Sequence, residues 1–412
     1  MENSVLKNRD FLKLWAGQGV SVFGSLVSRL ALPFMVIYTL SASPVQIALL
    51  RVSELLPGIL FGLFAGVWID RLPRRSVMIV ADTVRALFAG LLPVLLFAKH
   101  LQFVEIVLIA IVMSVSTVTF DSAYGAYIPS VVGQERLVDA NGKLSATEAI
   151  GEVVGFGISG ALFEFLGGAF TMSIDALTFI VSAATLIGIR KPEAPPSMET
   201  HRQHLWSELR QGVGYLRKNS VLSRLAGIAS VQNLFYGISG TVYMLYISRN
   251  LQIPPGTQGV LYAIGGVGTF ITANLVDWLF KRVGFGRVFL LVTIVGAAAV
   301  ALLPLAFGPT WVILFFILGQ QLLGDGADTV FEVGISGFRQ VKTEQAFLGR
   351  VNSIWQVLTW SSTLFGTVLG GELATLIGLR NTLFISVGIR VAEFILVYFS
   401  RVWKIQHIGE NL

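Results

Sequence analysis

The stretch Gly66-Val-Trp-Ile-Asp70-Arg71-Leu-Pro-Arg74-Arg75 joins two long apolar segments, 47–68 and 76–97. Each segment is long enough to cross the ~30 Å hydrocarbon core of a bilayer as a helix that rises about 1.5 Å per residue. The chain between them must therefore turn tightly at a membrane surface. Because arginines in short loops mark the cytoplasmic side, we expect this turn to face the cytoplasm.

The composition is that of a polytopic membrane protein. Of the 412 residues, 54% are hydrophobic and only 13% are charged, whereas an average soluble domain is about 25% charged. The chain has no cysteine, which excludes disulfides and thiolate metal sites. Its histidines fall in loops or in the tail, and no phosphate-binding Gly-x-x-x-x-Gly-Lys-Ser/Thr motif occurs. We expect no metal, no cofactor and no catalytic site.

Twelve apolar segments are long enough to span the membrane, so the sequence predicts an all-α membrane protein. The predicted spans are 11–38, 46–69, 76–97, 103–127, 145–164, 168–189, 222–247, 257–280, 287–307, 311–335, 350–374 and 380–402.

The positive charges indicate the orientation of these spans. Of the 30 lysines and arginines, three lie in predicted outer loops and four lie in spans, which leaves 23 on the inner side. The outer three are Lys99, Arg249 and Arg380, and those in spans are Arg29, Arg51, Arg85 and Arg390. Both termini should therefore be cytoplasmic. The net charge of +6 is a topology signal, and we expect no nucleic-acid partner.

The chain divides into two similar halves. Three prolines in 192–196 must end the sixth helix, and 204–218 has the spacing of an amphipathic helix on the cytoplasmic membrane surface. We predict bundles of six helices at 1–190 and 221–412, with 191–220 as the linker. The loop after the eighth span, with Asp277, Lys281, Arg282 and Arg287, repeats the 66–75 stretch in a degraded form. Such duplication is typical of secondary transporters, although a bundle that does not transport could also show it.

The 66–75 stretch resembles the signature of the major facilitator superfamily, Gly-x-x-x-Asp-Arg-x-x-Arg-Arg. Gly66, Asp70, Arg71, Arg74 and Arg75 match, whereas Pro73 stands where the superfamily usually has glycine. The resemblance implies two pseudo-symmetric six-helix bundles, and a gating loop that, with Asp82 and Arg85, latches the outward-open state.

Further segments resemble one bacterial branch of the superfamily, the macrolide-efflux and enterobactin-exporter-like proteins. They include 15–19, 126–129 and 348–351. In the fifth span, Gly151, Gly155 and Gly160 match the antiporter motif, although Phe156 replaces its usual proline. This resemblance implies proton-driven export of an amphipathic small molecule.

Ionisable residues inside spans are costly, at about 2.5–3.5 kcal/mol each on insertion scales, and therefore mark functional sites. Arg29, Arg51 and Glu54 share a depth in the outer half of the first two spans. Asp82, Arg85 and Asp121 share a depth near the cytoplasm, and we expect Arg85 to be the partner of Asp121. A purely structural ion-pair network is the alternative.

Asp325 is the first candidate for the proton carrier. It lies near the midplane of the tenth span between two glycines, with no basic residue within one turn. A buried carboxyl group without a basic partner can exchange protons near neutral pH, as proton coupling needs. Glu54 is the second candidate, and Asp328 and Asp121 are further ones. In the alternative, Arg390 of the last span pairs with Asp325 and makes it structural.

Candidates for the substrate pocket are residues that could offer an amphipathic molecule flat apolar surface and a few polar groups. Each could instead serve packing or anchor the protein at the membrane interface. They are Arg29, Gln232, Asn233, Tyr236, Tyr243, Trp355 and Trp360.

The sequence therefore predicts a monomeric exporter in a bacterial cytoplasmic membrane, which couples inward proton flow to export of macrolide-like amphipathic molecules by alternating access. Its partners would be this substrate, protons and the lipid bilayer. The alternatives are export of a siderophore, uptake of a nutrient or other solute, and a receptor or scaffold that does not transport. An enzyme is not expected, because no convergent nucleophile and base occur.

Overall fold

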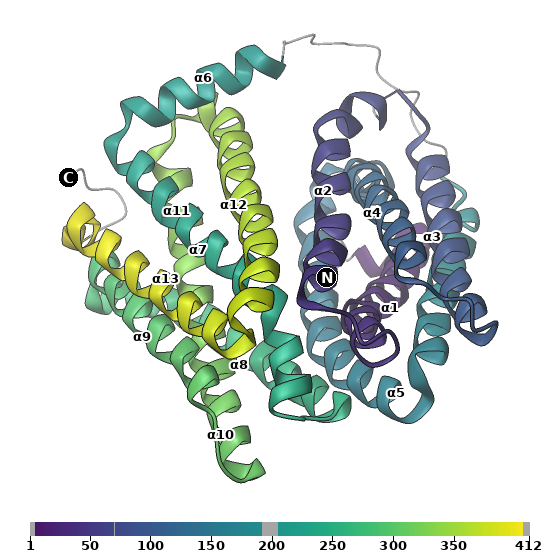
Figure 1. Cartoon of the computed structure of the whole chain (residues 1–412). Helices are drawn as coiled ribbons and strands as arrows, with labels where there is room; N and C mark the ends of the chain where they lie inside the picture. Colours follow the sequence, from purple (N-terminus) through teal and green to yellow (C-terminus); the bar gives the residue numbers. More distant parts are fainter. Residues whose placement is uncertain (1–4, 70, 192–204, 407–412) are drawn as a thin grey trace. The chain divides into compact units, whose positions relative to one another are not determined.

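The computed structural model describes residues 5–69, 71–191 and 205–406, and in these ranges the regular structure is helical with no strand. Figure 1 shows the helices in chain order. They are α1 (Arg9–Tyr38), α2 (Pro44–Ile69), α3 (Arg74–Phe97), α4 (Phe103–Val132), α5 (Leu137–Ile187), α6 (Leu205–Lys218), α7 (Ser220–Leu245), α8 (Pro255–Val283), α9 (Phe285–Leu305), α10 (Thr310–Gln320), α11 (Gly326–Lys342), α12 (Leu348–Ile377) and α13 (Leu379–Ser400).

Several helices begin at residues whose side chains can hold the first backbone N–H groups, which have no partner within a helix. The side chain of Asn8 accepts two such bonds at the start of α1, and that of Asn219 accepts two at the start of α7. At the start of α4, Gln102 and Glu105 form a reciprocal capping box. These caps stabilise the N-terminal ends of α1, α4 and α7, close to the points where the predicted apolar segments begin.

The fifth and sixth predicted spans form one helical run, α5, which is broken at Gly167. The φ of Gly167 is 78°, a left-handed conformation that glycine adopts without steric cost. The break falls between the predicted spans 145–164 and 168–189. The tenth predicted span is interrupted differently, because a π-helical segment, Gln321–Asp325, separates α10 from α11. A π segment inserts a residue into an α-helix and is frequent at functional sites.

Nine helical segments within the described residues are long and apolar enough to cross a membrane. One of them, Gln134–Ile187, contains both helices that meet at Gly167. α7 and α12 fall outside this group although they contain 26 and 30 residues, because polar side chains such as Gln232 and Gln356 lower their mean hydropathy. Together these helices account for the twelve predicted spans, and the all-α membrane fold is confirmed.

The chain forms two compact units. Among the described residues, unit 1 consists of 5–42, 49–69, 71–191 and 253–263, and unit 2 consists of 43–48, 205–252 and 264–406. In unit 1, α5 packs along α1 and α3, and α3 also packs on α4. In unit 2, α7 packs on α12 and α13, and α9 packs on α13. Each unit has its own apolar core, around Phe11 and Phe120 in unit 1 and around Phe289 and Phe338 in unit 2.

The predicted amphipathic helix in the linker is α6, which packs on α12 in unit 2. A Cβ added at Gly212 would lie 2.7 Å from the carbonyl oxygen of Arg350, so only glycine allows this approach without a shift. Tyr215 stacks on Phe347 with ring centroids 4.8 Å apart, and its hydroxyl accepts a bond from the Glu344 amide at 3.1 Å. The rest of the predicted linker, 192–204, lies outside the described residues.

Candidate functional site

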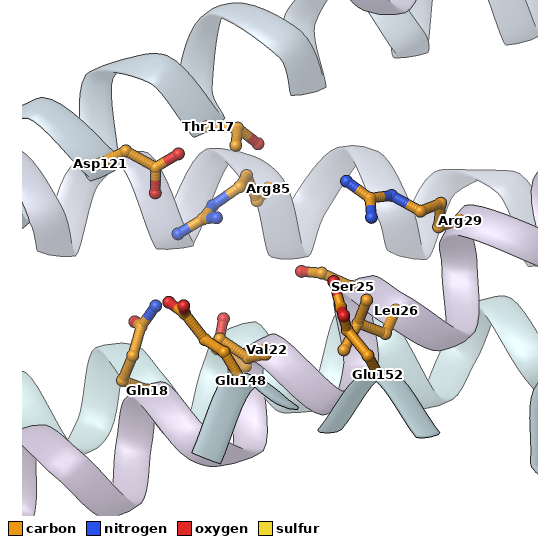
Figure 2. A pocket seen from close by; sticks show the side chains of 11 residues that line it. Gln18, Val22, Ser25, Leu26, Arg29, Arg85, Thr117, Asp121, Glu148 and Glu152 are labelled. Carbon is orange, nitrogen blue, oxygen red and sulfur yellow. The ribbon is translucent and has the colours of Figure 1, made fainter. Parts of the chain in front are cut away.

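Unit 1 contains a cavity of about 250 Å³ that we call the unit 1 cavity. Its lining mixes charged, polar and apolar side chains from four helices, α1, α3, α4 and α5 (Figure 2). The lining residues are Gln18, Ser21, Val22, Ser25, Leu26, Arg29, Arg85, Thr117, Asp121, Glu148 and Glu152.

Helical spacing brings the α1 and α5 residues of this lining to one side of each helix. On α1, Gln18, Val22, Ser25 and Arg29 follow one another at intervals of three or four residues, which is the repeat of one helix face. On α5, Glu148 and Glu152 are four residues apart. A single stripe on each helix therefore faces the cavity.

Two glycines of the predicted antiporter motif allow α5 to approach α1 closely. A Cβ added at Gly155 would lie 2.9 Å from the Cβ of Leu26, and one added at Gly151 would lie 3.2 Å from its Cδ1. Small residues let neighbouring membrane helices pack tightly. Because Gly151 lies between Glu148 and Glu152 in the chain, this contact holds both carboxylates beside α1.

Arg85 is the most deeply buried charge of the unit 1 cavity, with 4% of its surface exposed. It forms an ion pair with Asp82, one turn earlier on α3, and its guanidinium lies 4.3 Å from the ring of Phe120 and 4.5 Å from that of Phe179. The expected partner, Asp121, shares the cavity with Arg85 but forms no ion pair with it in the described part of the chain. Asp82 is nearer because both residues are on one helix at i and i+3.

Arg29, Arg51 and Glu54, which share a predicted depth in the outer half, form no ion pairs within the described residues. Within the described ranges, Glu54 is joined to neither Arg29 nor Arg51 by a salt bridge. Its carbonyl oxygen accepts a bond from the Ser114 hydroxyl. Arg29 lines the unit 1 cavity, whereas Glu54 does not.

Two arginines of the predicted gating loop form hydrogen bonds to backbone carbonyl oxygens of α4 and α5 in unit 1. Arg75 donates to the carbonyl oxygens of Leu186 at 2.8 Å and of Ile187 at 2.6 Å. These are the last residues of α5, whose carbonyl groups have no partner within the helix. Arg74 donates to the Ala126 carbonyl oxygen of α4 at 3.0 Å.

The remaining members of this loop are described by their location alone. Gly66 belongs to α2, Arg71 is exposed, and Asp70 lies outside the described residues. In the second loop, Asp277 and Lys281 form an exposed ion pair at 2.6 Å, and Arg282 and Arg287 are exposed.

Unit 2 contains a buried charge network around Arg390 of α13, which is 1% exposed. Its guanidinium pairs with Asp328 of α11 and, at 2.7 Å, with Glu393, which is completely buried. The ring of Phe235 lies 4.6 Å from the guanidinium. Gln232 of α7 reaches the same network, because its amide nitrogen lies 3.4 Å from the Asp328 carboxylate.

Asp325 is not part of the Arg390 ion pairs. Arg390 takes Asp328 and Glu393 instead, so the alternative in which Arg390 neutralises Asp325 is not the arrangement found. The Asp325 carboxylate is directed at Gly265 of α8, where only the absence of a side chain leaves room for it. Within the described ranges no salt bridge includes Asp325.

The other predicted pocket residues lie in unit 2. The Gln232 amide donates to the Tyr236 hydroxyl at 3.1 Å, and Asn233 accepts a bond from Thr363 at 3.1 Å. Trp355 is buried under Arg339, and Trp360 is 41% exposed. Tyr243 is on α7, two turns beyond Tyr236. Of the predicted pocket residues, Arg29 alone lines the unit 1 cavity.

Sequence reasoning missed the role of α5 in this cavity. Glu148 and Glu152 line it together with Gln18 and Ser21, none of which had been assigned. A signal was present, because the two glutamates are one turn apart beside Gly151 and Gly155. In the described part of the chain, no group of three or more His, Asp or Glu residues could hold a metal ion.

The chain is similar to known membrane transporters. A family described as transmembrane secretion effectors matches residues 3–410. Macrolide efflux protein A of Streptococcus pyogenes is 24% identical over 245 residues, which are 59% of this chain and 58% of that protein. The match therefore spans less than two thirds of the length of that relative. The multidrug efflux pump Tap of Mycolicibacterium fortuitum is 24% identical over 377 residues, 89% of this chain and 88% of the pump.

Solved structures share the fold. The inward-facing crystal structure of a bacterial homologue of the iron transporter ferroportin superposes with a TM-score of 0.75 at 19% identity, and the match covers 96% of this chain and 99% of that one. At this identity the likeness concerns the fold, which is the major facilitator fold. From the match along nearly its whole length, the chain belongs to the transmembrane secretion effector family of the major facilitator superfamily.

Proposed function

We propose that this transporter exports an amphipathic small molecule across the bacterial cytoplasmic membrane, by alternating access and at the expense of an inward flow of protons. The observation that carries the proposal is the unit 1 cavity, which places carboxylates and arginines beside apolar side chains. Ligand sites typically combine an apolar surface with a few placed polar groups. The names of the relatives, a macrolide efflux protein and a multidrug efflux pump, support export as the direction.

The proton carrier we propose is Asp325. Its support is the absence of a salt bridge to it in the described residues, its place in the π segment of the tenth span, and its position against Gly265. Asp328 is a weaker candidate because Arg390 holds it. Glu54 and Asp121 remain candidates because neither has an ion pair among the described residues.

Transport in inside-out membrane vesicles tests this function. We expect a macrolide or an amphipathic cationic dye to accumulate in the vesicles when an acidic interior is imposed, because each pH unit supplies about 1.4 kcal/mol per proton. The Asp325→Asn variant should lose the accumulation that depends on the gradient. Glu135→Gln, which removes an exposed carboxylate outside the gating loop, its repeat and the unit 1 cavity, should retain it.

Two other results would change the proposal. Gradient-driven accumulation that survives in Asp325→Asn would refute Asp325 as the proton carrier. Glu54 would then be the leading candidate, and Glu54→Gln the next variant to test. Folded protein that accumulates no compound would refute drug export in favour of solute uptake, siderophore export or a receptor.

A further inference from the structure

We propose that the unit 1 cavity binds a dipolar amphipath, with a positively charged group beside Gln18, Asp121 and Glu148 and an anionic oxygen group at Arg29. This inference rests on the proposed function and deepens it, since it names the chemical class of the substrate. It follows from the way charge is distributed along the cavity (Figure 2).

One end of the cavity has an excess of negative charge. The charge of Arg85 is balanced by its ion pair with Asp82. Asp121 and Glu148 have no ion pair within the described residues, and Figure 2 shows the Glu148 carboxylate beside the Gln18 amide. Two carboxylates without a basic partner make this end complementary to a cation.

Buried polar atoms at the same cavity also have no partner. Ser21 lines it with only 2% of its surface exposed. The amide oxygen of Gln18 and the Nε of Arg85, two residues that line the cavity, are buried without a hydrogen bond in the described part of the chain. Buried polar groups in native structures are nearly always hydrogen-bonded, so a bound molecule or water must supply these partners.

The other end of the cavity holds Arg29, together with the Glu152 carboxylate of α5, and no ion pair joins the two within the described residues. Arg29 follows Gln18 by eleven residues on α1, which is about 16 Å along a helix that rises about 1.5 Å per residue. Figure 2 shows the Arg29 guanidinium at the end away from Gln18, pointing along the cavity toward Arg85. Arg29 forms no ion pair in the described ranges. A guanidinium group matches a carboxylate in geometry and charge.

The middle of the cavity suits the apolar body of such a molecule. Val22 and Leu26 lie between the two charged ends on the same face of α1. A substrate with a single positive charge would leave Arg29 without a partner, whereas a dipolar one would satisfy both ends. The order of groups along α1 therefore favours a molecule that carries both charges.

Rhodamine B and its ethyl ester provide the test, because they share one cationic ring system and differ in whether the carboxylate is free. Their affinities are measured by fluorescence anisotropy with the purified full-length protein in lipid nanodiscs. We expect rhodamine B to bind about tenfold more tightly than the ester, since a charge-assisted hydrogen bond contributes roughly that factor. Arg29→Gln should remove this difference by weakening rhodamine B alone.

The acidic end is tested with the same two dyes. Glu148→Gln should weaken both dyes about tenfold, because both carry the cationic group that its carboxylate would contact. Glu135→Gln is the matched control, since it removes an exposed carboxylate outside the cavity, and it should change neither affinity. If a cavity variant fails to fold, the affinities of the two dyes for the unaltered protein still show whether the free carboxylate strengthens binding.

Three results would overturn the dipolar site: equal or tighter binding of the ester, equal weakening of both dyes by Arg29→Gln, or no binding of either dye. The test is separable from that of export. The expected binding pattern without gradient-driven accumulation would refute export and support the site. Accumulation together with equal affinities would refute the dipolar site and support export.

Discussion

At the scale of single residues, the Arg390 guanidinium is closely enclosed. It is held by Asp328 and Glu393 and covered by the ring of Phe235. Opposite it, a Cβ added at Gly296 of α9 would lie 2.7 Å from the guanidinium nitrogen Nη2. A charge this deep in a membrane protein is stable only when it is paired, so the space at Gly296 is part of what allows the pairing.

We expect Gly296→Ala to destabilise the folded protein by about 1–3 kcal/mol, as overpacking of a filled interior does. The guanidinium cannot move aside without lengthening its contacts with two carboxylates. Gly388→Ala on α13 is the control, because a Cβ there would meet nothing within 4 Å. Scanning fluorimetry in one detergent compares the two, and equal melting temperatures would show that Arg390 is not held as described.

At the scale of helices, close backbone contact joins α7 and α12. A Cβ added at Gly237 would lie 2.2 Å from the carbonyl oxygen of Thr363, and one at Gly366 would lie 2.4 Å from that of Leu234. The Thr363 hydroxyl also donates to Asn233. Small residues and hydrogen bonds of this kind associate helices in membranes, where lipid removes the hydrophobic driving force.

Gly237→Ala should separate α7 from α12 and destabilise unit 2 by at least about 2 kcal/mol, because the new methyl group meets backbone atoms that cannot rotate away. Gly227→Ala on the same helix has nothing within 4 Å of its Cβ and should be neutral or slightly stabilising. Thermal unfolding of the two variants checks this. Similar stability of the two would mean that the close contact is absent.

At the scale of the whole molecule, the distribution of lysine and arginine predicts that both termini and the α6 region are cytoplasmic. Loops such as the one at His100, between α3 and α4, are then outside. Membership of the major facilitator superfamily agrees with a multi-pass chain, and the orientation itself stays a prediction.

The chain has no cysteine, so single cysteines can report this orientation. In intact cells, a membrane-impermeant maleimide should label His100→Cys, and it should label Lys218→Cys only after permeabilisation, because Lys218 ends α6. The reverse pattern would invert the topology. It would also reverse the expected direction of transport in inside-out vesicles.

Much of the fold could be predicted from local properties of the chain. The break at Gly167 falls between two predicted spans because a glycine separates two apolar segments. α6 begins and ends close to the predicted limits because its apolar residues recur at helical spacing. The π segment before Gly326 was not predicted. In a stretch that is apolar on all sides, one inserted residue does not change the hydrophobic pattern, so the sequence gives no sign of it.

The sequence by itself determined the class of membrane protein, the number and approximate limits of its spans, and the superfamily. These follow from hydropathy, charge bias and short motifs, which act along the chain. Only the tertiary structure decided that Arg390 pairs with Asp328 instead of Asp325 and that Glu148 and Arg29 line one cavity, whereas the pairing of Arg85 with Asp82 is local to one helix. The physical reason is that a buried charge takes the partner that helix packing brings within reach, and packing depends on small residues such as Gly155, whose contacts are distant in sequence.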